Sequence, residues 1–264
     1  MFTKLLAYEI RSRFRADARS FGAFIVTIAV ASGIVAAGLP GVSGSTAVLA
    51  YALCALTPVA CAIAAMADYW KTLYGQRGYF TMSLPVSGKV IFWAKNTRMV
   101  IECLLALALA VGGIIAVASA AAWSDGISLA EYTAGPRSLA AGLPTSTVVI
   151  MIVAQVLVSL SWLVQGSAVI SIGSEGRFNH MGFGAPVIGF VLLYIVNQVL
   201  STVGTFFLPL SVTTDGHFST EIMWTSYQAT LGTDGHPNVI GIGSYVLVPL
   251  FALIMGLWAS RSIE

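Results

Sequence analysis

Few side chains in this sequence could perform covalent or acid–base chemistry. Gly41-Val42-Ser43-Gly44 fits a GxSG pattern, in which the serine of an intramembrane protease is the nucleophile. Such a serine needs a nearby base. The histidines, however, all fall in predicted loops: His180, His217 and His236. We therefore disfavour a protease and expect the chain not to be an enzyme.

Aspartate and histidine occur together twice in one predicted loop, as Asp215-Gly216-His217 and Asp234-Gly235-His236. Both residue types are zinc ligands, so a metal site is one interpretation. Asp-Gly is also a turn signal, and Met223, Tyr227 and Leu231 recur between the two copies at helical spacing. We favour two turns around a short helix and predict no bound metal.

Arg98 and Glu102 are four residues apart, so they share a helical face near the start of an apolar run. An ionisable residue inside a membrane is a functional candidate by default. Because this pair lies close to the predicted membrane boundary, we favour an ion pair that anchors the helix locally.

A predicted span near the C-terminal end of the chain has a polar face. Spacings of one and four residues bring together Asn197, Gln198, Ser201, Thr202 and Thr205. This face is either a wall of a translocation path or a set of hydrogen bonds between helices, which contribute about 0.6–1.7 kcal/mol each. Both interpretations stay open at this point.

The elements that must position these side chains are membrane-spanning helices. The chain is 57% hydrophobic and 9% charged, whereas an average soluble domain is roughly 25% charged. Its apolar runs are about 18 or more residues long, enough for a helix to cross about 30 Å of hydrocarbon. They lack the alternation of barrel strands, and an open strand would leave backbone groups unpaired in lipid. We predict an all-α polytopic membrane protein.

The predicted fold is a single transmembrane domain over residues 1–264. Its six spans lie at about 21–39, 47–67, 99–123, 147–172, 185–208 and 242–260. Residues 68–98 form a cytoplasmic loop, and residues 209–241 form an external loop that carries the short helix.

Residues 1–20 have an amphipathic pattern. Phe2, Leu6, Ile10 and Phe14 recur every four positions among basic residues, which is typical of an interfacial helix. The alternative is a cytoplasmic extension of the first span. That span is longer than the apolar core of a signal peptide and begins later, so we expect an uncleaved anchor.

Basic residues predict the orientation of the chain. All but one of the 13 Lys and Arg residues lie on one side of the predicted spans, and Arg137 is the exception. The positive-inside rule then places both termini in the cytoplasm. We expect a multi-pass protein of a bacterial cell membrane, in contact with the lipid bilayer.

The 68–98 loop is aromatic as well as basic. Its aromatic residues are concentrated in one stretch: Tyr69, Trp70, Tyr74, Tyr79 and Phe80. Aromatic residues and arginine are favoured at protein interfaces. A membrane-interface belt is the alternative, but it does not explain Tyr79 and Phe80, which lie well beyond the span. After Pro85, Ser87 is placed to cap a helix that continues into the third span.

This loop resembles the first cytoplasmic loop of type-two ABC exporter permeases, which reads roughly Tyr-Gly-x-x-Gly-Tyr-x-x-x-Leu-Pro-Val-Ser before a basic residue. The matching residues here are Tyr74, Gly75, Gly78, Tyr79, Leu84, Pro85, Val86, Ser87 and Lys89. The segment Tyr8-Glu9-Ile10-Arg11 also looks like the entry helix of that family.

The resemblance implies that the chain is the permease subunit of an ATP-driven exporter and forms its translocation path. In that family, the segment before Leu-Pro is a coupling helix that docks on an ATP-hydrolysing subunit. The resemblance therefore implies docking roles for Tyr69, Trp70, Lys71, Tyr74, Gly75, Arg77, Gly78, Tyr79 and Phe80.

ATP hydrolysis is expected in a separate polypeptide. The only Gly-Lys pair, Gly88-Lys89, lacks both the following Ser or Thr and the earlier glycine of a phosphate-binding loop. ATP and magnesium would then bind to an ABC ATP-binding subunit, and this chain would bind no cofactor. The implied assembly also contains a second permease, either identical or paralogous, and no nucleic acid. The alternative is a secondary transporter or channel that works without an ATPase.

Overall fold

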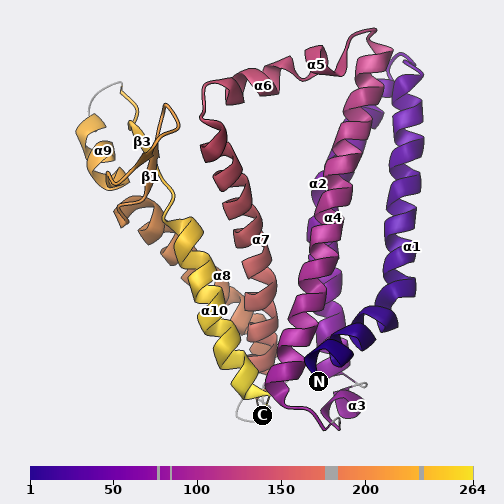
Figure 1. Cartoon of the computed structure of the whole chain (residues 1–264), viewed down its shortest axis with the longest axis vertical. Helices are drawn as coiled ribbons and strands as arrows, with labels where there is room; N and C mark the ends of the chain where they lie inside the picture. The colour runs from indigo at the N-terminus through magenta and orange to yellow at the C-terminus, as the bar shows by residue number, and fades with distance from the viewer. Residues whose placement is uncertain (76–77, 84, 176–183, 232–234, 264) are drawn as a thin grey trace. The chain divides into compact units, whose positions relative to one another are not determined.

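The computed structural model describes residues 1–75, 78–83, 85–175, 184–231 and 235–263 (Figure 1). The chain divides into two compact units, Met1–Ser138 and Leu139–Glu264. That both units belong to a single transmembrane domain stays a prediction.

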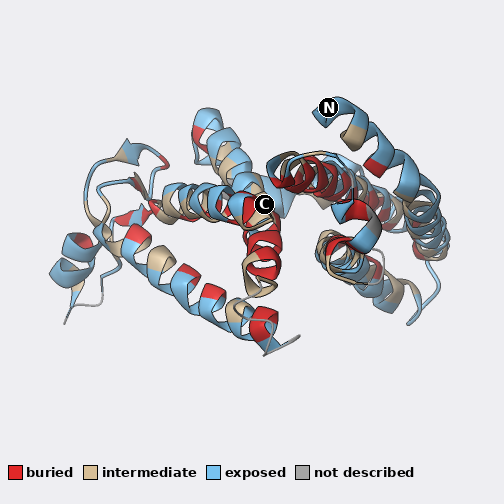
Figure 2. Ribbon diagram, turned by 90° about the horizontal axis from the view of Figure 1, so that it is seen from below, coloured by how far each residue is buried: buried red, intermediate tan, exposed pale blue. Residues whose placement is uncertain are grey.

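Among the described residues, six helices are long and apolar enough to cross a membrane. They are α1 (Phe2–Ala36), α2 (Ser43–Leu73), α4 (Gly88–Ser124), α7 (Thr145–Gly173), α8 (Gly184–Phe207) and α10 (Ser244–Ser262). Each corresponds to one predicted span, so the prediction of a mainly helical, multi-pass membrane protein is confirmed. Figure 2 shows that many residues of these helices are exposed. The exposed residues include large hydrophobic side chains. Lipid solvates such apolar surfaces favourably, whereas water does not.

In the first unit, α4 packs against both α1 and α2. One core cluster contains Ile28, Cys54 and Val117, contributed by these three helices. Gly113 allows the helices to approach closely, because a Cβ atom at this position would lie 2.7 Å from the Sγ of Cys54. Two short helices that we did not predict follow α4: α5 (Leu129–Tyr132) and α6 (Ala134–Ala141).

The N-terminal residues do not form a separate helix. They are the first turns of α1, which bends in Figure 1 but continues through residue 20. The apolar stripe is largely exposed at Ile10 and Phe14, whereas Glu9 is buried. A location of this segment at the membrane interface stays a prediction.

The predicted helix after Pro85 is present as α4. Ser87 is its N-cap residue, with extended backbone angles, and the Ser87 carbonyl oxygen accepts a hydrogen bond from the Ile91 amide. The Ser87 side chain makes no capping hydrogen bond within the described part of the chain. A short helix, α3 (Gly78–Met82), precedes this turn.

The second unit contains α7, α8 and α10 together with a small antiparallel sheet. Its described strands are β1 (Ser211–Thr213), β2 (Phe218–Ser219) and β3 (Val239–Gly241), in the order β2-β1-β3. The all-α prediction missed them because strands of two or three residues are too short to show a period-two pattern. The short helix predicted in this region is present as α9 (Met223–Thr230).

The first Asp-Gly-His copy forms the turn that joins β1 to β2. Gly216 has φ +82°, a left-handed conformation that favours glycine. The hydroxyl of Thr147 donates to the Gly216 carbonyl oxygen at 2.6 Å and thereby attaches this turn to α7. This agrees with the turn interpretation for the first copy, whereas Asp234 of the second copy lies outside the described residues.

Candidate functional site

A group of charged side chains connects α1, α2 and α4 inside the first unit. We call it the charged cluster, and its described members are Glu9, Arg13, Asp17, Asp68, Lys95, Arg98 and Glu102. Most of it is buried, and its central residue, Arg98, is only 1% exposed. Burying a charge is costly unless the charge is paired and hydrogen-bonded. The contacts of each member therefore determine whether this arrangement is stable.

Arg98 on α4 bridges the three helices. Its Nη1 donates to Oε1 of Glu102 at 2.7 Å, and its Nη2 donates to Oδ2 of Asp68 on α2 at 3.0 Å. Its Nε lies 3.8 Å from Oε2 of Glu9 on α1. The predicted Arg98–Glu102 ion pair is thus present. It is not a local anchor, however, because the same guanidinium also binds two other helices.

Two further bases complete the charged cluster. Lys95 is one turn before Arg98 on α4, and its Nζ donates to Oε1 of Glu9 at 2.9 Å and to the hydroxyl of Thr72 at 3.0 Å. Arg13 on α1 donates to Oδ1 of Asp68 at 3.0 Å. Lys95 and Arg98, the two buried bases of the charged cluster, therefore both have carboxylate partners, which offset part of the loss of hydration.

Sequence reasoning found one of these ion pairs and missed the others. A spacing of four residues identifies Arg98 with Glu102, because both lie on one helix. Glu9 and Asp68 are on other helices, and no local periodicity connects them to α4. The sequence signals for the other ion pairs are weaker than a spacing of four residues. Lys95 shares a face with Arg98, and Glu9 is an acid within a basic segment.

Thr72 connects the charged cluster to α3. Its hydroxyl accepts the hydrogen bond from Lys95, and its carbonyl oxygen accepts one from the Thr81 hydroxyl at 2.8 Å. Gly78 is buried where α3 begins, and a Cβ atom there would overlap the carbonyl oxygen of Leu73. The short helix is therefore held closely against the end of α2.

The segment that contains the predicted docking residues, 69–80, has two parts in the structure. Its beginning is the last part of α2, and its end is α3. Tyr79 on α3 is 88% exposed and Lys71 on α2 is also exposed, so both are accessible to a partner. Trp70 and Tyr74 are half-buried with their ring centroids 5.8 Å apart.

The structure corrects the assignment of Tyr69. This residue is 0% exposed and packs edge-to-face against Phe92, with ring centroids 6.4 Å apart. Because α2 continues to Leu73, Tyr69 lies on the face of the helix that packs on α4, where no partner protein can contact it. Gly75 and Gly78 contribute close backbone packing, since a Cβ at either position would be too near α2. Arg77 and the side chain of Phe80 lie outside the described residues.

The predicted polar face of α8 is divided between buried and exposed positions. Asn197 is 3% exposed, and its Nδ2 donates to Oε1 of Gln165 on α7 at 2.7 Å. Gln165 in turn donates to the carbonyl oxygen of Val248 on α10 at 3.1 Å. Thr205 approaches Ser244 of α10, with 3.4 Å between the hydroxyl oxygens.

The remaining polar residues of this face are less buried. Gln198 and Thr202 are exposed, and Ser201 is half-buried. The face is therefore not a uniform polar wall. Asn197 hydrogen-bonds to a neighbouring helix, whereas Gln198 and Thr202 are exposed. A translocation path along this face stays a prediction.

Replacing Asn197 with Leu should destabilise the second unit by about 1–2 kcal/mol, because the Gln165 amide would lose a buried partner. Replacing the exposed Gln198 with Leu is the matched control and should change the stability by less than about 0.5 kcal/mol. Unfolding of both purified variants in detergent measures the difference. Equal effects of the two substitutions would contradict the structural role of Asn197.

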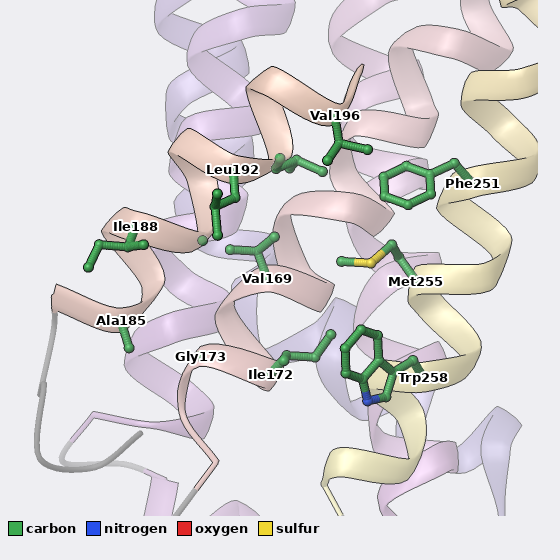
Figure 3. A pocket seen from close by; sticks show the side chains of 12 residues that line it. Val169, Ile172, Gly173, Ala185, Ile188, Leu192, Val196, Phe251, Met255 and Trp258 are labelled. Carbon is green, nitrogen blue, oxygen red and sulfur yellow. The ribbon is translucent and has the colours of Figure 1, made fainter. Parts of the chain in front are cut away.

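The second unit also contains an apolar cavity of about 320 Å³ between α7, α8 and α10 (Figure 3). Figure 3 shows Val169, Leu192, Phe251 and Met255 pointing into it, and Trp258 near one end. Its lining is almost entirely hydrocarbon, so it has few groups that could orient a polar ligand.

The charged cluster, with α3 beside it, is the candidate site that the geometry supports best. It has the buried, convergent charges that are uncommon in a membrane protein and that mark functional positions there. Comparisons of the chain with protein-family models, with curated proteins and with solved structures found no match.

Proposed function

We propose that this chain is the permease subunit of an ABC exporter and that it docks a separate ATPase through α3 and the adjacent end of α2. The observation that carries the proposal is the connection between α3 and the charged cluster. Exposed Tyr79 lies on α3, and α3 is hydrogen-bonded through Thr81 and Thr72 to Lys95. A force applied to α3 would therefore reach the residues that join α1, α2 and α4.

In this proposal, the partner subunits bind ATP and magnesium and close on nucleotide binding. Their movement displaces α3, and the buried ion pairs transmit the displacement to the membrane helices. Ion pairs suit this role because they are directional and strong in a water-poor site. A second permease, identical or paralogous, completes the translocation path. Both termini and α3 are on the cytoplasmic side, as the distribution of basic residues predicts.

Purification of the tagged chain from gently solubilised membranes of its host tests this function. We expect an ATPase subunit with a phosphate-binding loop to be recovered with the chain, and the complex to hydrolyse ATP. Recovery of the chain without an ATPase, together with transport driven by an ion gradient in reconstituted vesicles, would overturn the proposal in favour of a secondary transporter. An unrelated multi-pass protein with the same tag controls for nonspecific recovery.

A further inference from the structure

A second cavity lies beside the charged cluster in the first unit. It has a volume of about 480 Å³ and runs between α1 and α2, with Glu102 of α4 in its wall. On α1 it extends from Arg13 to Thr27, a distance of about 20 Å along a helix. It is therefore elongated and reaches from the predicted membrane boundary into the apolar part of the unit.

The two parts of this cavity differ in chemistry. Three members of the charged cluster, Arg13, Asp17 and Glu102, line one part, whereas Phe21, Phe24 and Leu53 line the part farther along the helices. Ligand sites of about 300–1,000 Å³ with apolar walls and a few polar groups are typical of small-molecule binding. This pattern fits an elongated ligand with one polar end.

The charges favour a positive group at that polar end. Within the described residues, the charged cluster contains four carboxylates but three bases. Asp17 is the least compensated of these carboxylates, because its ion pair with Arg13 is 3.7 Å long and Arg13 binds Asp68 more closely. Asp17 and Glu102 both line this cavity. Two adjacent carboxylates repel each other unless a proton or a cation lies between them.

We propose that this cavity binds an amphipathic cation, with its ammonium or guanidinium group against Asp17 and Glu102 in the cavity wall and its hydrocarbon part along Phe21, Phe24 and Leu53. An anionic ligand would meet the excess carboxylate, since Arg13 is already held by Asp17 and Asp68. This inference does not depend on the proposed function, because binding needs only the chain itself.

Cys61 provides a native probe, since it lines the cavity and is half-buried. Replacing Cys54 and Cys103 with Ala leaves Cys61 as the single cysteine of the chain. In lipid nanodiscs, saturating decyltrimethylammonium should slow the reaction of Cys61 with a maleimide about tenfold or more, whereas decyl sulfate should leave the rate nearly unchanged. In a control variant, all three native cysteines are replaced with Ala and Ser128→Cys places a single cysteine at an exposed position. This variant controls for direct effects of the amphiphiles on the reagent.

Charge removal gives the second arm of the test. Asp17→Asn should raise the concentration of decyltrimethylammonium needed for half-maximal protection by about tenfold, as expected for the loss of about 1.4 kcal/mol. It leaves the hydrogen bonds of Arg98 in place. Asp125→Asn, which neutralises an exposed acid at the end of α4, is the matched control and should not change this concentration. Equal protection by decyl sulfate, no protection by either amphiphile, or an unchanged concentration for Asp17→Asn would each overturn the proposal.

Discussion

Replacing Arg98 with Met should lower the free energy of unfolding of the first unit by about 3–5 kcal/mol. Methionine retains much of the side-chain volume but removes the guanidinium. Glu102 and Asp68 would then each lose a charge-assisted hydrogen bond in a largely buried site. Leaving a buried carboxylate without its base costs more than the original pair contributed. Thermal or denaturant unfolding of the purified chain in detergent measures the change.

Two further variants separate electrostatics from packing. Lys71→Met removes an exposed base from α2 and should change stability by less than about 0.5 kcal/mol. Adding Glu102→Gln to Arg98→Met should recover part of the loss, because it removes one of the stranded charges. If Arg98→Met alone were as stable as the unmodified chain, the charged cluster would not hold these helices together.

Replacing Tyr79 with Ala should weaken ATPase binding by about tenfold or more, with little change in the stability of the permease. Exposed aromatic residues are frequent hot spots of protein interfaces, where truncation costs about 2 kcal/mol or more. Because Tyr79 is 88% exposed, its side chain contributes little to the fold. Co-purification of the ATPase with each variant, at matched permease yield, measures the effect. Tyr8→Ala, at an exposed tyrosine of α1, is the control and should retain the ATPase.

Gly78→Ala tests the position of α3 independently of the Tyr79 side chain. The added methyl group would overlap the Leu73 carbonyl oxygen, so α3 must shift away from α2. We expect ATPase binding to fall even though Tyr79 is still present. Full retention of the ATPase by both the Tyr79→Ala and the Gly78→Ala variants would show that docking does not occur at α3.

The membrane helices could be predicted because their signals are local. Each span is one uninterrupted apolar run, and a helix satisfies all its backbone hydrogen bonds within that run. The start of α4 could be predicted equally well, since Pro85 and Ser87 act on the residues beside them. The predicted ends of the helices were less accurate. Helix α2 continues to Leu73, beyond the predicted boundary near residue 67. Packing on α4 stabilises these polar turns, which a hydropathy criterion excludes from the span.

The site was predicted only in part, because most of its contacts join residues that are far apart in the sequence. A separation of four residues on one helix revealed Arg98 and Glu102, but Glu9 and Lys95 are 86 residues apart in the chain. Their contact depends on how α1 packs against α4, which no local pattern specifies. Tyr69 and Tyr79 show the same limit, since both are aromatic residues of one predicted loop. Tyr69 is in the core, whereas Tyr79 is exposed.

The sequence by itself determined the number and position of the membrane helices, the start of α4 and the presence of an aromatic, basic loop. These depend on hydrophobicity and on backbone preferences of neighbouring residues. Only the tertiary structure decided which polar residues face one another: the charged cluster, the Asn197–Gln165 hydrogen bond and the cavity beside Asp17. Burial and charge pairing arise between helices, where residues distant in sequence share one small volume of low dielectric.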